Sequence, residues 1–137
     1  MGEINFYGGG VGIGGGGAAP GPDWAVMTPA TLLANTNDWV PPATTTGWVI
    51  TLGGGDRDLT GIVPPLGTST AQNYWLVNFD ITSGKKVKLK HDDPASLVTN
   101  RFCLPDGVDF DILPYQLTVL TYNQVFQRWF ILAGGRH

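Results

Sequence analysis

Cysteine, histidine and charged side chains are all scarce in this chain, and each shortage removes a class of function. The single cysteine, Cys103, excludes a disulfide within the chain, and two histidines leave too few ligands for a tetrahedral zinc site. Cys103 lies between Phe102 and Leu104, so we expect a buried, unreactive thiol. No serine, histidine and aspartate occur in the context of a nucleophile elbow. The sequence therefore predicts no enzyme activity, no metal and no cofactor.

Charge is sparse and slightly acidic. Charged residues make up 14% of the 137 residues, and the net charge of −3 provides no basic field to attract nucleic acid. No apolar run reaches the length of a membrane span, and the N-terminus lacks the pattern of a signal peptide. We therefore expect a protein made in the cytoplasm that binds neither nucleic acid nor membrane. A surface with so few charges suits contact with other protein.

The main basic cluster follows a predicted strand. Lys86, Lys88 and Lys90 alternate with Val87 and Leu89, so the three lysines share one strand face. One interpretation is a solvated strand face or an edge strand protected against aggregation. The other is a patch that binds an acidic partner surface.

Two acidic clusters have the composition of metal sites but not the ligand number. The segment His91-Asp92-Asp93 has too few neighbouring histidines or cysteines for zinc, and we interpret it as a polar loop. Asp109 and Asp111 share a strand face, and Asp106 lies in the turn before them. A calcium site needs about six to eight oxygen ligands from a shaped loop, so we expect none here.

Residues 1–23 form a Gly-rich segment that contains about half of the 20 glycines of the chain. Such a composition predicts an extended arm rather than a packed element. Apolar residues punctuate the arm and indicate that it orders against a neighbouring subunit; they are Ile4, Phe6, Tyr7, Val11 and Ile13. The run Gly12–Gly17 matches a dinucleotide fingerprint formally, but no strand precedes it and prolines follow where a helix must open.

Short apolar segments separated by glycine and proline recur along the rest of the chain. They predict about eight strands in one β-sandwich domain, jelly-roll-like, over residues 24–137. The longest, Tyr74–Ile81, is predicted to be central, and residues 100–132 are predicted to form three consecutive strands. Thr28-Pro29 has the chemistry of a helix start, which predicts one or two helical turns over residues 30–35.

Aromatic residues are the remaining candidates for a binding site. We expect Trp24 and Trp39 to cover the base of the core. Strand position predicts that Trp48, Trp75 and Trp129 belong to the core and that Tyr74, Tyr115 and Phe126 are exposed at strand ends. Exposed aromatic rings would also suit a platform on which sugars stack.

An ordered set of short motifs resembles a β module of tailed-bacteriophage virion proteins. The motifs are Leu59-Thr60-Gly61-Ile62, Asn78, the segment 88–92, Asn100-Arg101-Phe102, Leu104-Pro105-Asp106-Gly107 and Arg128-Trp129. Modules of this kind occur in small capsid decoration proteins and in fibre or tail proteins. The resemblance spans about Trp48 to Leu132 and departs from the pattern at Tyr115-Gln116 and at residues 122–125.

This resemblance implies a structural role in the virion. Because the only addition to the module is a short arm, it favours a capsid decoration, or cement, protein on the capsid surface, a homotrimer bound to the major capsid protein. The expected capsid or subunit contacts are Ile4, Phe6, Tyr7, Val11, Ile13 and Trp24. The expected structural corner comprises Asn100, Arg101, Phe102 and Trp129, with Arg101 either paired with Asp92 or Asp93 or placed at a subunit joint.

Two other classes of function remain open at this point. One is a phage tail or fibre component, or a receptor-binding module that recognises carbohydrate. The other is a free-standing β-sandwich binding module unrelated to phage. Exposed aromatic residues would favour the sugar-binding class, whereas affinity for capsid shells would favour the decoration protein.

Overall fold

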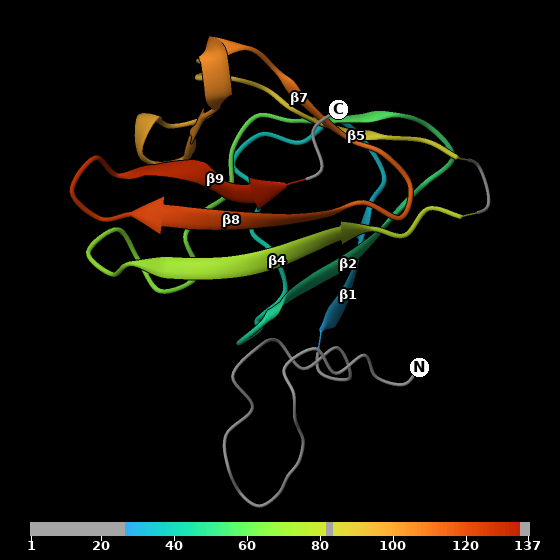
Figure 1. Cartoon of the computed structure of the whole chain (residues 1–137), viewed down its shortest axis with the longest axis horizontal. Helices are drawn as coiled ribbons and strands as arrows, with labels where there is room; N and C mark the ends of the chain where they lie inside the picture. The colour runs from blue at the N-terminus through green and yellow to red at the C-terminus, as the bar shows by residue number, and fades with distance from the viewer. Residues whose placement is uncertain (1–26, 82–83, 135–137) are drawn as a thin grey trace, which may run out of the picture.

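The computed structural model describes residues 27–81 and 84–134. Strands account for most of the regular structure, two short 3₁₀ helices occur at η2 (Val98–Asn100) and η3 (Pro105–Gly107), and no α-helix occurs in those two ranges (Figure 1). The strands are β1 (Thr28–Leu32), β2 (Gly47–Leu52), β3 (Arg57–Leu59), β4 (Gln72–Asn78), β5 (Val87–Leu89), β6 (Phe102–Cys103), β7 (Phe110–Ile112), β8 (Leu117–Asn123) and β9 (Arg128–Gly134). They form a six-stranded sheet in the order β1-β2-β4-β8-β9-β6 and a three-stranded sheet in the order β3-β5-β7. The predicted all-β fold is confirmed, and β4 lies inside its sheet as expected.

Alternation of side chains decides which face of each strand is buried. In β8, Thr118, Leu120 and Tyr122 are buried, whereas the residues between them are only half-buried. Successive side chains of a strand point to opposite faces, so the buried set faces one core and the other set faces outward. The same period of two marks β2, where Trp48 and Ile50 are fully buried.

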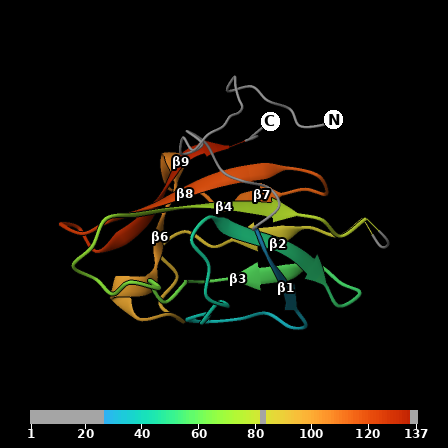
Figure 2. The same cartoon turned by 90° about the horizontal axis from the view of Figure 1, so that it is seen from below.

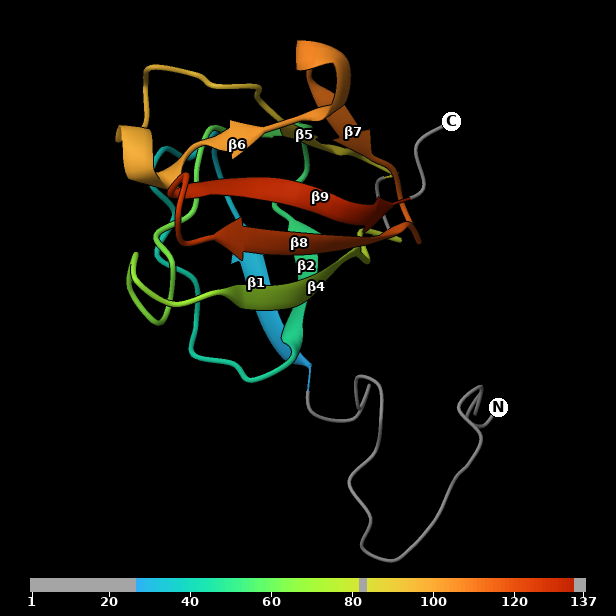
Figure 3. The same cartoon turned by 60° about the vertical axis from the view of Figure 1, so that its left-hand side comes forward.

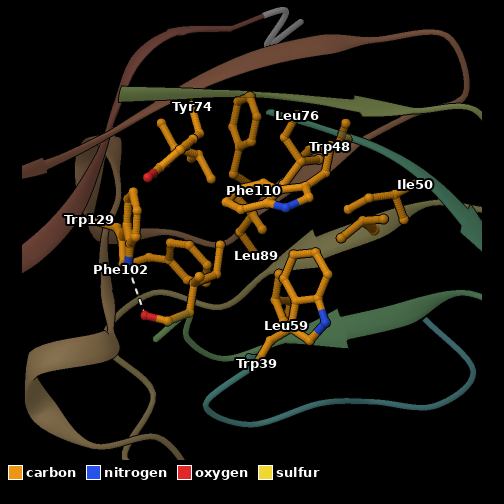
Figure 4. Close-up of a cluster of buried hydrophobic side chains, with 14 of the residues drawn as sticks. Trp39, Trp48, Ile50, Leu59, Tyr74, Leu76, Leu89, Phe102, Phe110 and Trp129 are labelled. Carbon is orange, nitrogen blue, oxygen red and sulfur yellow. Dashed lines mark hydrogen bonds between the residues drawn. The ribbon is translucent and has the colours of Figure 1, made fainter. Parts of the chain in front are cut away.

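Both sheets contribute to one hydrophobic core (Figure 4). Leu76 and Trp48 enter it from the large sheet, and Leu59, Leu89 and Phe110 enter it from the small sheet. Complete burial of a large apolar side chain stabilises a fold by roughly 1.5–3 kcal/mol. A cluster drawn from both sheets therefore binds them into one unit.

A continuous chain of aromatic rings runs through this core. The ring centroids of Trp39 and Trp48 lie 5.4 Å apart, those of Trp48 and Tyr74 4.9 Å, those of Tyr74 and Trp129 6.2 Å, and those of Trp129 and Tyr122 5.0 Å. Such spacing allows tilted and edge-to-face contacts, which add to the energy of burial. Trp39 is therefore part of the core as expected, while Trp24 lies outside the described residues.

Figure 2 shows β3 of the small sheet in a different layer from β4 and β8 of the large sheet. Single bridges connect the segments that follow β1 and β5 to strands of the other sheet. Thr36, which follows β1, pairs with Leu59 of β3, and His91, which follows β5, pairs with Phe102 of β6. The outer strands of the large sheet are therefore linked to the small sheet on both sides. Exposed strand edges invite pairing with other chains; the bridge to His91 covers part of the free edge of β6, whereas the bridge at Thr36 lies beyond β1 and leaves the edge of β1 open.

Parallel and antiparallel pairs are mixed in both sheets. The pairs β1–β2, β2–β4, β3–β5 and β6–β9 are parallel, whereas β4–β8, β8–β9 and β5–β7 are antiparallel. To form a parallel pair, the chain must cross back to the end of the sheet at which the first strand of the pair began. Loops rather than tight hairpins make most of these connections.

The helical turns predicted after Thr28-Pro29 are wrong, because this segment is strand β1 (Figure 3). The carbonyl oxygen of Leu32 accepts a 3.1 Å hydrogen bond from Gly53 N, so Leu32 faces the neighbouring strand β2. Backbone groups alternate in direction along a strand, which turns Pro29 toward the open edge, where a missing N–H is harmless. Pairing with β2 over five residues overrides the local capping signal.

Two predictions about aromatic burial are also wrong. Tyr74 is only 4% exposed, because its position in β4 points it into the core rather than away from it. Trp75, the next residue, is half-buried on the opposite face of the same strand and is absent from the core cluster. A shift of one residue in the assumed strand phase exchanges the two faces. Cys103 is half-buried rather than fully buried.

Candidate functional site

The four residues of the predicted structural corner lie together where the two sheets meet. Phe102 pairs with Trp129 in the parallel β6–β9 ladder, and Trp129 N donates a 3.0 Å hydrogen bond to the carbonyl of Arg101. Asn100 accepts a 2.9 Å hydrogen bond from Ile62 N at its carbonyl oxygen. The indole Nε1 of Trp129 donates to the carbonyl of Ile62 at 2.8 Å (Figure 4). These contacts fix the chain at a point where three segments converge: residues 100–102, β9 and the segment around Ile62.

Arg101 stabilises this corner through its side chain. Its Nε donates a 2.9 Å hydrogen bond to the carbonyl of Ser96, and its guanidinium lies 3.4 Å from the carboxylate of Asp92. Arg128 approaches the same carboxylate at 3.8 Å. Of the two aspartates proposed as partners of Arg101, the structure places Asp92 beside it. Because the Asp92 side chain is 51% exposed, each of these ion pairs adds little to stability.

Sequence patterns did not indicate a partly buried polar network centred on Asp38. One carboxylate oxygen of Asp38 accepts hydrogen bonds from Leu97 N and from Asn100 Nδ2, both at 2.8 Å. Asp38 N donates to Ser96 Oγ at 2.8 Å, and Ser96 Oγ lies 2.6 Å from Thr60 Oγ1. Asp38 has a φ of 47°, which aspartate tolerates in turns. The partners of Asp38 lie about 60 residues away in the sequence, so no local pattern indicated this network.

His91 and its neighbours form a hydrogen-bonded corner. His91 Nδ1 accepts a 3.0 Å hydrogen bond from Leu104 N, which places the ring proton of a neutral imidazole on Nε2. His91 N donates to a carboxylate oxygen of Asp109 at 2.9 Å. Within residues 27–81 and 84–134, no group of three or more histidine, cysteine, aspartate or glutamate side chains is arranged to bind a metal. The arrangement ties the end of β5 to the segment between β6 and β7.

Lys88 of β5 and the flanking Lys86 and Lys90 lie on the outer face of the small sheet, beside the carboxylates of Asp111 in β7 and of Asp109 just before it. Lys86 and Lys88 lie 2.9 and 3.2 Å from the two carboxylate oxygens of Asp111, and Lys90 lies 2.7 Å from a carboxylate oxygen of Asp109. Strand β5 lies between β3 and β7, so the interpretation of a protected edge strand is wrong. The ion pairs favour a charged, solvated strand face over a patch that binds an acidic partner.

The pKa values of these carboxylates reflect the neighbouring lysines. The hydrogen bond from Lys90 is the main reason that the pKa of Asp109 lies below its usual range. Partial burial acts to raise the pKa of Asp111, but hydrogen bonds from Lys86 and Lys88 outweigh it and lower the pKa. In turn, the hydrogen bond to Asp111 raises the pKa of Lys86. Both aspartates therefore stay ionised at neutral pH.

Exposed aromatic residues gather at both ends of β8. Tyr115, 69% exposed, packs edge-to-face against Phe79, 43% exposed, with ring centroids 6.0 Å apart. Phe126, 67% exposed, lies beyond the other end of β8, with its ring centroid 6.3 Å from that of Phe130. The predicted exposure of Tyr115 and Phe126 is confirmed, and Phe79 is an exposed ring that the sequence did not indicate.

The predicted capsid or subunit contacts lie outside the described residues; they are Ile4, Phe6, Tyr7, Val11, Ile13 and Trp24. No helix in the described part of the chain is long and apolar enough to cross a membrane.

Comparison of the chain with protein-family models, with curated proteins and with solved structures finds no match.

Proposed function

We propose that the chain is a bacteriophage virion structural protein, a capsid decoration or cement protein that binds the major capsid protein as a homotrimer. One observation carries this proposal. Four of the motifs that resemble the phage module lie apart in the sequence but meet in one hydrogen-bonded corner: Leu59-Thr60-Gly61-Ile62, the segment 88–92, Asn100-Arg101-Phe102 and Arg128-Trp129. Residues that define a shared scaffold are expected to contact one another in this way, so the convergence supports membership of that structural class.

The proposed action is mechanical. A rigid β domain that spans the joint between neighbouring capsid subunits adds buried area there and raises the free energy needed to separate them. Many identical copies make a modest contact effective. In this proposal the Gly-rich arm, residues 1–23, lies along the capsid or a sister subunit and pairs its backbone there.

A jelly-roll-like sandwich is the finer form of this proposal. The antiparallel run β4–β8–β9 and the two sheets around one core are compatible with it. The parallel pairs β1–β2 and β2–β4 depart from a fully antiparallel jelly roll. We therefore propose a variant of that architecture in which the first strands enter in parallel.

The position of the protein in the assembled particle tests the proposed function. Antibody labelling and image reconstruction of purified virions should place the chain on the head surface, at the joints between capsid subunits. Heads that lack the protein should take it up when it is added and then resist heating better. A location on the tail would favour the fibre class instead, and absence from purified particles would overturn a structural role in the virion.

A carbohydrate-binding module is the second candidate, and the exposed pair of Phe79 and Tyr115 favours it. Aromatic rings at a protein surface can stack against the apolar face of a sugar ring. If this pair binds sugar, Tyr115→Ala should abolish binding to host surface glycans on an array. Phe126→Ala, which removes an equally exposed ring at the opposite end of β8, should leave such binding unchanged. The absence of glycan binding by the unaltered chain would eliminate this candidate.

A further inference from the structure

The outward face of the six-stranded sheet is apolar over its centre. We call this surface the uncharged face and define it by Val49, Trp75, Val77, Leu117, Val119 and Phe130. Strand register places these residues in adjacent rows across the sheet: Val49 beside Val77, Val77 beside Leu117, and Trp75 beside Val119. The parity of β4 and β8 points the residues of these two strands away from the side chains that form the core cluster; Val77 is nevertheless buried, and the other five residues of the face are half-buried. Figure 1 is viewed onto β4 and β8, with β1 and β2 behind them.

Charge is distributed unequally between the two sheets. Among the residues of β1, β2, β4, β6, β8 and β9, Arg128 is the single charged residue, and it lies at the start of β9 near Asp92. The outer face of the small sheet, in contrast, carries three lysines in and beside β5 and two aspartates in and beside β7. A sheet that faces water on one side usually alternates apolar and polar residues, whereas a sheet covered on both sides is apolar on both. Over the residues of the uncharged face, the large sheet has the second pattern, while Thr31, Thr51 and Asn73 mark its polar margin.

The position and length of the N-terminal segment indicate what covers this face. Residues 1–26 end directly before Met27 and β1, and β1 is the outermost strand of the same sheet. An extended chain of 26 residues reaches roughly 85 Å. Six strands spaced by about 4.8 Å span only about 24–29 Å, so the segment is about three times longer than its own face requires. It is long enough to reach the sheet of a neighbouring molecule.

The composition of the segment fits the same surface. Residues 1–26 contain two charged side chains, Glu3 and Asp23, and their apolar residues are interspersed with glycines, which allow a backbone to approach a sheet closely. A face of six short strands offers about 500 Å², so two such faces packed together would bury only about 1,000 Å², the lower limit for a specific interface. An exchanged segment would raise this area toward that of stable oligomers.

We propose that the uncharged face binds residues 1–26 of a second copy of this chain. The inference rests on the homo-oligomer of the proposed function and identifies the surface that forms it. The open edge of β1 extends the site. The backbone carbonyl of Leu32 points toward β2, so the backbone N–H and C=O of the preceding residue, Thr31, point away from β2. A segment laid across the face can pair with this edge as an added strand.

Cross-linking between two differently tagged full-length chains tests the inference. Cys103→Ser removes the native thiol from both; one chain then carries Phe6→Cys in the segment, and the other carries Thr121→Cys on the outward side of β8. After mixing, a short bis-maleimide reagent should give a covalent product that contains one chain of each kind. No such product, or a product only when both cysteines are in one chain, would overturn the inference.

A charge placed on the face provides the matched comparison. Val119→Lys puts an ammonium group at the centre of the uncharged face and should lower the cross-link yield about tenfold or more, because an unpaired charge is costly to bury. Val40→Lys makes the same change in an exposed loop and should leave the yield unchanged. Thr51→Lys, at an exposed margin of the face, provides a second variant if Val119→Lys unfolds, as thermal melting would reveal.

The outcomes separate this inference from the proposed function. Labelling on the capsid surface without interchain cross-links would keep the decoration role and overturn the exchanged segment. Interchain cross-links without any label on virions would keep the exchanged segment and overturn the virion role.

Discussion

The indole Nε1 of Trp129 donates a 2.8 Å hydrogen bond to the backbone carbonyl of Ile62, 67 residues earlier in the chain. Both residues are fully buried, so neither group can exchange its partner for water. The Trp129 ring also contacts Tyr74 and Tyr122 in the core. One side chain therefore joins the large sheet to the Leu59–Ile62 segment and continues the row of aromatic rings.

Trp129→Phe should destabilise the protein by about 3 kcal/mol. The change leaves the Ile62 carbonyl without this donor in a buried setting, which costs about 1–3 kcal/mol, and the smaller ring leaves a cavity. Denaturant unfolding followed by circular dichroism measures the effect. Tyr122→Phe is the comparison, because it deletes only the hydroxyl that donates to the Thr99 carbonyl at 2.7 Å and should cost about 1–2 kcal/mol. Equal losses of stability in the two variants would contradict the conclusion that Trp129 stabilises the protein through both its hydrogen bond and the packing of its ring.

Gly61→Ala should be destabilising by about 2–3 kcal/mol, because the corner leaves no room for a methyl group. A Cβ at Gly61 would lie 2.7 Å from the carbonyl oxygen of Asn100 and 2.7 Å from Ser96 Oγ. Gly55→Ala is the control, since a Cβ there meets only the flexible end of the Arg57 side chain at 3.0 Å. Thermal unfolding should separate the two variants, and a Gly61→Ala protein as stable as the parent would refute the packing described for the corner.

The sequence predicted those elements of the fold whose signal lies in neighbouring residues and missed those that depend on distant partners. The alternation in β8 and the apolar run of β4 predicted these two strands, because both patterns lie within the residues of the strand itself. The capping signal at Thr28-Pro29 was local too, but pairing with β2 outweighed it. Parallel pairing leaves no mark in neighbouring residues, since the partners lie far apart in sequence. The mixed sheet was therefore unpredictable from local patterns.

The residues of the candidate site likewise differ in whether a local sequence pattern marks them. Asn100-Arg101-Phe102 and Trp129 were identified as a corner because their motifs stand out in sequence order. Their partners Asp38 and Ser96 carry no such pattern, and only folding brings them within hydrogen-bonding distance. The uncharged face was also missed, since its residues come from separate strands and become one surface only through sheet register.

Asn78→Ala should cost about 3 kcal/mol, because Asn78 is a buried hub of hydrogen bonds. Its Nδ2 donates to the carbonyls of Lys85 and Ile112 at 2.8 and 2.9 Å, and its Oδ1 accepts from Asp80 N at 3.0 Å. Asn73→Ala, an exposed position in the same strand, is the matched control and should change stability by less than about 0.5 kcal/mol. Urea unfolding measures both variants, and similar midpoints would show that the Asn78 contacts contribute little.

Acid should weaken the small sheet through Asp109 and Asp111. Both pKa values lie below the ordinary value of 3.8: the Lys90 hydrogen bond is the main cause for Asp109, and for Asp111 the lysine hydrogen bonds outweigh burial. A carboxylate with a lowered folded pKa contributes stability above its unfolded pKa and loses it as pH falls through the folded pKa. The melting temperature of the parent should therefore fall as the pH drops below about 4.

Asp109→Asn removes one of these titrating groups, so its melting temperature should decline less steeply with acid than that of the parent. The difference should amount to a few degrees at most, because the side chains of Asp109 and Lys90 are about one third exposed and solvent screens the pair. Lys90→Gln should flatten the acid limb in the same direction, since it deletes the hydrogen bond that lowers the Asp109 pKa. Salt at about 1 M should reduce the difference between parent and variants by screening the Coulombic part of the interaction. Parallel acid limbs for the parent and Asp109→Asn would mean that this ion pair does not contribute to the pH dependence.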